Sequence, residues 1–230
     1  MNPAGRRALV TGAGIGTGRA IALALAAAGA EVVVSDIDEE GGRRTAADCG
    51  ERARFVHADL TVSDDVRELI ESAEPAILVN NAGGGGHIPP HFPEASPERW
   101  GATLDLNLRA PMLATQHALA SMRRAGGGVI VNVASTAGLG SERGQSPEYA
   151  AAKAGLIRFT AAFASVDGVR VNCIAPDWIA TERVTREERA SIPPPIPLST
   201  ITAEVIRLIT DDSLAGRVVV IWRGQAPRLL

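Results

Sequence analysis

Seven short apolar-rich runs recur along the chain, and segments of helical pattern or loops separate them. The runs cover residues 7–10, 31–35, 54–58, 76–79, 128–133, 169–174 and 216–221. The run at 76–79 is apolar throughout, as expected of a strand that is covered on both faces. This alternation of strand and helix predicts an α/β fold built on a parallel sheet.

The segments between the runs supply the helices and one irregular stretch. Helical patterns cover residues 19–28, 63–73, 97–124 and 203–210, and another helix begins near Ser146. Ser63 and Ser146 are expected to cap their helices, and Pro147 suits the first helical position. Residues 178–200 are rich in proline, which predicts a substrate loop or lid. With no repeat or linker, residues 1–230 are expected to form a single domain.

Composition is that of an ordinary globular protein. Charged residues make up 21% of the chain, hydrophobic residues 46%, and the formal net charge is −3. Arginines are scattered among acids, so we expect no nucleic-acid or membrane partner. Neither the two cysteines nor the four histidines show a metal-ligand spacing, so no metal is expected. The first residues lack a signal-like pattern, and a cytoplasmic location is the default expectation.

The only tyrosine and the only lysine of the chain, Tyr149 and Lys153, stand four residues apart. Side chains at this spacing share one helix face. Tyr149 falls in the first helical turn, where the helix dipole and the Lys153 charge are both expected to stabilise a phenolate and lower the pKa from about 10. The alternative is a core tyrosine beside a solvated lysine.

A glycine-rich turn, Thr11–Gly18, links the first strand to the first helix. Glycines let the backbone approach a diphosphate closely, and the N–H groups at the helix start attract the anion. Asp36 ends the second strand, twenty residues beyond Gly16, where a carboxylate can accept hydrogen bonds from the adenosine ribose. A 2′-phosphate would meet like charge there. The pattern predicts NAD(H) over NADP(H), and Thr17 agrees, because a basic residue there would favour the extra phosphate.

Six motifs follow one another along the chain: Thr11–Gly18, Asn80–Gly83, Asn107, Ser135, Tyr149-x-x-x-Lys153 and Pro176 to Thr181. Together they resemble the short-chain dehydrogenase/reductase family, and the likeness covers nearly the whole chain. The resemblance implies a single Rossmann-type, doubly wound domain with about seven parallel strands and helices on both faces. It also implies an NAD(P)-dependent enzyme that acts on a small-molecule secondary alcohol or ketone.

The resemblance also implies roles for individual residues. Tyr149 would be the general acid/base, Lys153 would lower its pKa and bind the nicotinamide ribose, and Ser135 would hold the substrate oxygen. Asn107 would support a water in a proton relay through Lys153. The residues implied to bind the cofactor are Gly12, Ile15, Gly16, Gly18, Asp36, Ile37, Asp59, Leu60, Asn81, Tyr149, Lys153, Ile179 and Thr181.

Two departures from the family pattern and two alternatives accompany this interpretation. Asp177 follows Pro176 where the family commonly has glycine, and the interval from Ser135 to Tyr149 is one residue longer, which the loop at 139–145 is expected to absorb.

The alternatives are a 3-oxoacyl-type reductase that uses NADPH and a catalytically silent dinucleotide-binding regulatory protein. The resemblance further implies a homodimer or homotetramer built on the long helices that contain Asn107 and Lys153.

Overall fold

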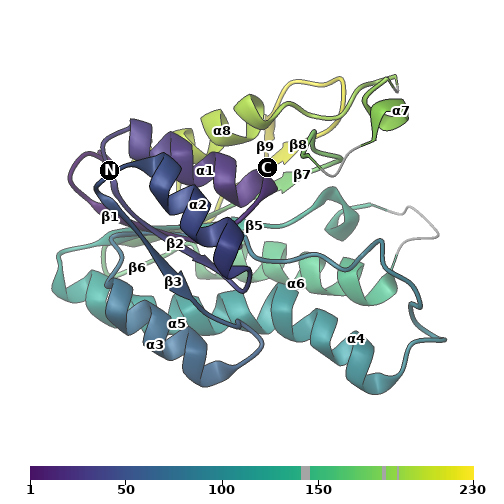
Figure 1. Cartoon of the computed structure of the whole chain (residues 1–230), viewed down its shortest axis with the longest axis horizontal. Coiled ribbons are helices and arrows are strands. Elements are labelled where there is room, and N and C mark those ends of the chain that lie inside the picture. The colour runs from purple at the N-terminus through teal and green to yellow at the C-terminus, as the bar shows by residue number, and fades with distance from the viewer. Residues whose placement is uncertain (141–145, 183–184, 191) are drawn as a thin grey trace.

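A single mixed sheet forms the centre of the molecule in the computed structural model (Figure 1), which describes residues 1–140, 146–182, 185–190 and 192–230. The strands are β1 (Arg7–Thr11), β2 (Glu31–Asp36), β3 (Ala53–His57), β4 (Ile77–Asn80), β5 (Gly128–Val133), β6 (Ser165–Val166), β7 (Val169–Pro176), β8 (Val218–Ile221) and β9 (Arg228–Leu229). Their order across the sheet is β3-β2-β1-β4-β5-β7-β8-β9, with β6 beside β7.

Seven of these strands run parallel and correspond to the seven runs seen in the sequence. The two additional strands, β6 and β9, contain two residues each and pair antiparallel with β7 and β8. The predicted doubly wound α/β fold of Rossmann type is therefore confirmed, with nine strands among the described residues in place of about seven. The chain reverses direction across the sheet between β1 and β4, which is where ligands bind in such folds.

Helices cover both faces of the sheet. They are α1 (Gly16–Ala27), α2 (Glu39–Cys49), α3 (Ser63–Ala73), α4 (Pro97–Leu104), α5 (Ala110–Arg124), α6 (Pro147–Phe163), α7 (Arg186–Arg189) and α8 (Leu198–Thr210). In Figure 1, α1, α2 and α8 lie above the sheet, and α3, α4, α5 and α6 lie below it. Adjacent residues of β1 point to opposite faces of the sheet. Val10 packs in the core beneath α1 and α8, and Leu9 packs in the core against α3 and α5.

Three sequence expectations about the helices need correction. The helix expected at 97–124 is divided by a π-helical segment, Asp105–Arg109, between α4 and α5. Ser63 is the first residue of α3 rather than its cap, and its Oγ accepts a hydrogen bond from Arg109 at 2.7 Å. The last helix begins at Leu198 rather than Ala203, because the preceding prolines end at Pro197.

The other capping prediction is confirmed: Ser146 caps α6, and Pro147 takes the first helical position. The irregular segment expected at 178–200 contains the four-residue helix α7, and Ile179 and Ile196 pair as an isolated bridge across its base. Of the loop expected at 139–145, residues 141–145 lie outside the described residues. Within the described part of the chain, none of the helices has the length and apolar content needed to cross a membrane.

Candidate active site

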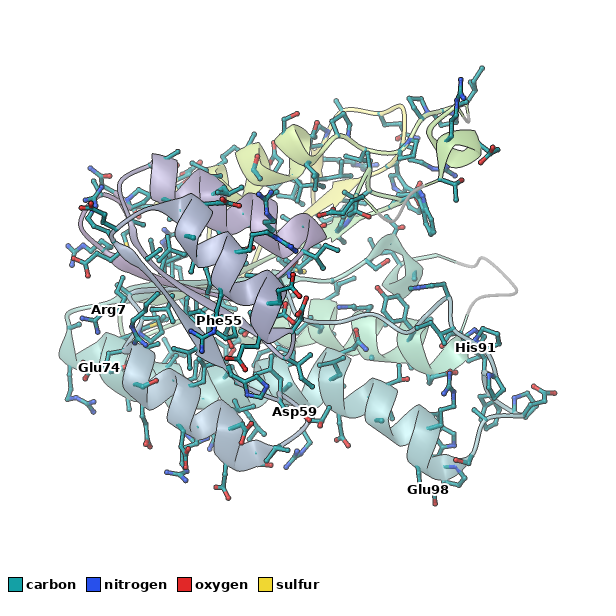
Figure 2. All side chains as sticks on the ribbon, in the orientation of Figure 1. Arg7, Phe55, Asp59, Glu74, His91 and Glu98 are labelled. Carbon is teal, nitrogen blue, oxygen red and sulfur yellow. The ribbon has the colours of Figure 1, made fainter. Side chains whose placement is uncertain are left out.

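A cleft of about 660 Å³ opens at the carboxyl ends of the parallel strands. Figure 2 shows His91 at the right-hand end of the molecule, in the loop that follows β4, and Arg7 and Glu74 at the opposite end. The cleft is lined by every candidate residue from the sequence except Asn107, namely Gly12, Ile15, Gly16, Gly18, Asp36, Ile37, Asp59, Leu60, Asn81, Ser135, Tyr149, Lys153, Ile179 and Thr181.

The glycine turn forms one wall of this cleft. Gly12 and Gly16 have φ of 61° and 64°, a backbone region that favours glycine. A Cβ on Gly18 would collide with the carbonyl oxygen of Gly12 and with the Asn81 amide, so this crossing of α1 over the turn requires glycine. Asn81 Nδ2 donates to the carbonyl oxygens of Thr11 and Gly12, both at 2.9 Å. The end of β4 therefore fixes the turn.

The start of α1 offers backbone N–H groups to an anion. Ile15 precedes the helix in an extended conformation, and its side chain provides no capping acceptor. Unpaired N–H groups at a helix start attract phosphates. One of them is already used, because Gly16 N–H donates to the carboxylate of Glu182 at 3.1 Å. This contact was not expected from the sequence, since the two residues are 166 positions apart.

Asp36 lines the cleft beside the glycine turn. Its Oδ2 accepts from Gly14 N–H at 2.7 Å, and its Oδ1 accepts from Asp38 N–H at 2.9 Å. These bonds hold the carboxylate at the end of β2, beside the glycine turn. Ile37, which is 63% exposed, continues the same wall. The Asp36 carboxylate therefore lines the cleft at the end of β2.

Tyr149 and Lys153 enter the cleft from the first two turns of α6. Ser146 Oγ accepts from Tyr149 N–H at 3.2 Å, which fixes the start of the helix. Lys153 Nζ lies 5.5 Å from the centre of the Tyr149 ring and donates to the Val133 carbonyl at 3.0 Å. The two side chains therefore share one face of α6, as the four-residue spacing predicts.

Ser135 reaches the same place from the end of β5. Its Oγ accepts from Ala137 N–H at 3.2 Å, which opens the short 3₁₀ turn Thr136–Gly138, and the Ser135 side chain acts to lower the pKa of the Tyr149 phenol. A Cβ on Gly138 would lie 2.5 Å from the backbone nitrogen of Ala154, so this turn packs directly on α6. The close packing of two backbones sets the serine beside the tyrosine.

Asn107 lies behind the cleft in the π-helical segment. Its Oδ1 accepts from Gly84 N–H at 3.0 Å, and its Nδ2 donates to the carbonyls of Gly84 and Thr103, both at 2.9 Å. A Cβ on Gly83 would lie 2.6 Å from Asn107 Oδ1 and 3.0 Å from Lys153 Nζ. Asn107 and Lys153 therefore face the same backbone segment, although Asn107 does not line the cleft.

Burial controls the protonation of the central pair. Burial raises the pKa of Tyr149, and the hydrogen bond with Ser135 only partly opposes it. Burial also lowers the pKa of Lys153 to about 8. The sequence-based expectation of a lowered Tyr149 pKa was therefore wrong for this structure, because removal of the phenol from water outweighs its polar surroundings.

Two acidic residues of the site were not assigned a role from the sequence. Glu148, buried beside Tyr149, lies 3.2 Å from His91 Nδ1 through its Oε1 and accepts from Phe92 N–H at 3.3 Å. His91 thus contacts Glu148 and does not line the cleft. Asp177 does line it, and Arg223 Nε donates to its Oδ2 at 3.0 Å. The described residues contain no group of three or more side chains placed to bind a metal.

Comparison with known proteins identifies the family of the chain. The family model described as short chain dehydrogenase matches residues 6–191. An uncharacterized oxidoreductase of Thermotoga maritima is 36% identical over 219 residues, which cover 89% of this chain and 84% of that protein. The cis-4-hydroxycyclohexanecarboxylate dehydrogenase of Sinomonas cyclohexanicum is 34% identical and covers 91% of each chain.

A solved structure described as a short chain dehydrogenase/reductase family protein superposes with a TM-score of 0.88 at 30% identity. The match covers 97% of this chain and 98% of that one. Fold, ordered motifs and relatives agree, and the chain belongs to the short-chain dehydrogenase family of oxidoreductases.

Proposed function

We propose that this protein is an NAD(H)-dependent oxidoreductase that interconverts a secondary alcohol and its ketone. One observation carries the proposal: Ser135, Tyr149 and Lys153 line the same cleft as the glycine turn and Asp36. Side chains that can transfer a proton and a glycine turn that can bind a dinucleotide therefore line one cavity. Enzymes of this family use nicotinamide dinucleotides, which supports the cofactor class.

The residues present fit such a cofactor. Gly12 and Gly18 pack directly against Ala82 and Asn81, which holds the turn in a compact shape, and the start of α1, which lacks a side-chain cap, offers N–H groups to a diphosphate. Asp36 would hold the adenosine ribose, Asp59 and Leu60 would flank the adenine, and Lys153 would bind the nicotinamide ribose. The remaining contacts proposed for the cofactor come from Ile15, Gly16, Ile37, Asn81, Ile179 and Thr181.

The proposed chemistry divides between cofactor and chain. A bound nicotinamide dinucleotide would supply the hydride in reduction and accept it in oxidation. Tyr149 Oη gives a proton to the carbonyl oxygen in reduction and removes one from the hydroxyl in oxidation, and Ser135 Oγ hydrogen-bonds the same oxygen. When protonated, Lys153 would favour the phenolate by its charge and so oppose the effect of burial on Tyr149. Asn107 holds the Gly83–Gly84 backbone beside Lys153 and would support the relay water.

The assignment of Tyr149 is tested by the variant Tyr149→Phe. It removes the proton donor, so we expect turnover to fall by at least about 100-fold. Thermal stabilisation by NAD⁺ should persist, because the cradle is untouched. A variant that keeps normal turnover would exclude Tyr149. If the wild-type protein binds NAD⁺ but turns over no alcohol or ketone, the silent regulatory protein becomes the better assignment.

The choice of NAD(H) over NADP(H) depends on Asp36 and is tested by thermal unfolding. A ligand that binds only the folded state stabilises it by about 2.7 kcal/mol at 100 times its Kd. We expect a clear rise in Tm with NAD⁺ and little with NADP⁺. In Asp36→Ala the NAD⁺ effect should shrink and the difference between the two cofactors should narrow. A preference of the wild type for NADP⁺ would overturn this choice.

One relative keeps a second candidate function open. The 3-oxoacyl-[acyl-carrier-protein] reductase of Chlamydia muridarum is 35% identical over 189 residues, which cover 77% of this chain. The same Tyr149 chemistry would serve a 3-oxoacyl-type reductase using NADPH. Asp36 argues against it, since its carboxylate would repel the 2′-phosphate. Faster reduction of a 3-oxoacyl thioester with NADPH than of simple ketones with NADH would favour this candidate.

We also propose that the protein forms a homodimer or homotetramer through α5 and α6. Both helices line an apolar groove of about 470 Å³, to which Leu108, Met112, Phe159 and Phe163 contribute. Met112 is 41% exposed there. A second copy of the same face would cover these side chains. The cytoplasmic location expected from the sequence stays a prediction.

A further inference from the structure

Large apolar side chains are exposed around one end of the cleft. Ile88, Phe92, Leu139 and Trp178 are 51%, 57%, 38% and 43% exposed. They lie in the three segments that follow β4, β5 and β7, at the right-hand end of Figure 1. We call these four residues the apolar rim. Exposed apolar groups that gather at a cleft mark a binding surface, whereas scattered ones do not.

Two members of the rim are tied to the turn that carries Tyr149. Gly86, two residues before Ile88, packs on the phenol, since a Cβ there would lie 2.7 Å from Tyr149 Cδ1. Phe92 N–H donates to Glu148, the residue directly before Tyr149, at 3.3 Å. The loop that bears Ile88 and Phe92 therefore borders the proposed proton donor.

The other two members belong to the segments that follow β5 and β7. Leu139 directly follows Gly138, whose backbone packs on α6 at Lys153 and Ala154. Trp178 lies between Asp177 and Ile179, which both line the cleft. Its carbonyl accepts from Ile196 N–H at 2.8 Å, which fixes the base of this segment. The four rim residues thus belong to segments that reach the cleft near Tyr149, although none of the four lines the cleft itself.

The longest rim loop is held in place rather than loosely attached. Arg99 donates to the carbonyls of Ile88, Pro89 and Pro90 at 3.0–3.2 Å. Glu148 holds the loop at His91 and Phe92. Apolar side chains on a fixed loop can bind a ligand without the entropy cost of ordering that loop.

Charge at this end of the cleft disfavours an anionic substrate. Asp177 is the acidic residue that lines the cleft beyond Pro176, and Arg223 compensates it through one carboxylate oxygen. Among the described residues, the other charged group that lines this end of the cleft is Lys153, which is buried and bonded to Val133. A substrate carboxylate close to the rim would therefore meet Asp177 without a free cation among the described lining residues.

We propose that the substrate is an uncharged secondary alcohol or ketone with a bulky apolar body, which the rim covers while Tyr149 and Ser135 hold its oxygen. The inference rests on the proposed function and specifies its substrate class. Each methylene that the rim removes from water should raise kcat/KM about fourfold.

The first test is a homologous series of 2-alkanols with NAD⁺, extended by one methylene at a time. We expect kcat/KM to rise about threefold to fourfold per methylene until the rim is filled. A hydroxy acid of matched length and a sugar should each be at least about tenfold poorer, because a carboxylate or several hydroxyls must be desolvated. A flat series, or preference for the hydroxy acid or the sugar, would overturn the inference.

Variants distinguish a contribution of the rim to substrate binding from the general effect of removing an exposed apolar side chain. Trp178→Ala and Phe92→Ala should raise KM for the longest alcohol several-fold more than they raise KM for the shortest alcohol. Val62→Ala is the matched control, since Val62 is 45% exposed but precedes α3. Equal effects of Trp178→Ala and Val62→Ala on the long alcohol would contradict the rim.

A binding measurement keeps the inference separate from the proposed function. Thermal unfolding with NAD⁺ present is recorded with and without a long-chain 2-ketone, for the wild type and for Trp178→Ala. If no substrate is turned over but the ketone stabilises only the wild type, the oxidoreductase proposal fails and the apolar site stands. If alcohols are oxidised but the ketone stabilises neither protein, the apolar site fails and the oxidoreductase proposal stands.

Discussion

At the scale of single residues, the ionisation of the proposed proton donor can be measured directly, because Tyr149 is the only tyrosine of the chain. The absorbance of tyrosinate during a pH titration of the folded protein therefore measures Tyr149 alone. We expect a pKa above the usual value of about 10, since burial raises it. Ser135→Ala should raise it further by removing the hydrogen bond that lowers it. A titration below pH 10 in the protein without cofactor would contradict this expectation.

The second prediction at this scale concerns the pH dependence of stability. Burial lowers the pKa of Lys153 from 10.5 to about 8. Between these values the folded state binds fewer protons than the unfolded state, so this group's contribution to stability rises with pH and is lost as pH falls towards 8. The stability of Lys153→Met relative to wild type should therefore fall by roughly 2 kcal/mol between about pH 7.5 and 9.5. Denaturant unfolding at several pH values measures this difference, and a pH-independent difference would contradict it.

The sequence located these residues better than it described their surroundings. The spacing of Tyr149 and Lys153 placed both on one helix face, because helical periodicity is local. It could not give the direction of the Tyr149 pKa, which depends on how many distant atoms exclude water. Nor did it show that Glu148 holds the loop of His91 and Phe92, since that contact spans 57 and 56 positions.

At the scale of helices, two glycines predict opposite outcomes for the same substitution. Gly18→Ala in α1 places a methyl group against Gly12 and Asn81, so we expect several kcal/mol of destabilisation and loss of NAD⁺ binding. A Cβ on Gly101 in α4 meets nothing within 4 Å, so Gly101→Ala should stabilise by about 0.5–1 kcal/mol. Thermal unfolding of both variants tests the pair, and a similar change in both would contradict the packing at Gly18.

The division of the helix expected at 97–124 shows the limit of reading elements from sequence. The helical pattern continues through the segment, and the predicted helix type is correct on both sides of Asp105–Arg109. The local widening coincides with Asn107, whose amide bonds to the Gly84 backbone 23 positions earlier. Such π-helical turns often occur at functional sites, and tertiary contacts rather than propensity decide them.

At the scale of the whole molecule, the parallel sheet followed from seven apolar runs, because buried parallel strands must be apolar on both faces. The strands β6 and β9 were missed, since two-residue segments carry no periodicity. The cleft itself was predictable in position, because ligands gather at the carboxyl ends of such strands. Its apolar rim was not, because loop contacts such as those of Arg99 decide which side chains stay exposed.

The last prediction concerns assembly, because the groove on α5 and α6 is the other large apolar surface of the described chain. If a second copy covers it, sedimentation at micromolar concentration should give at least twice the 23.9 kDa of one chain. Met112→Glu would bury a charge in that interface and should shift the protein towards the monomer. Val62→Glu, which adds the same charge at another exposed apolar position, should leave the assembly unchanged. Monomeric wild type, or equal dissociation of both variants, would show that the groove is not the interface.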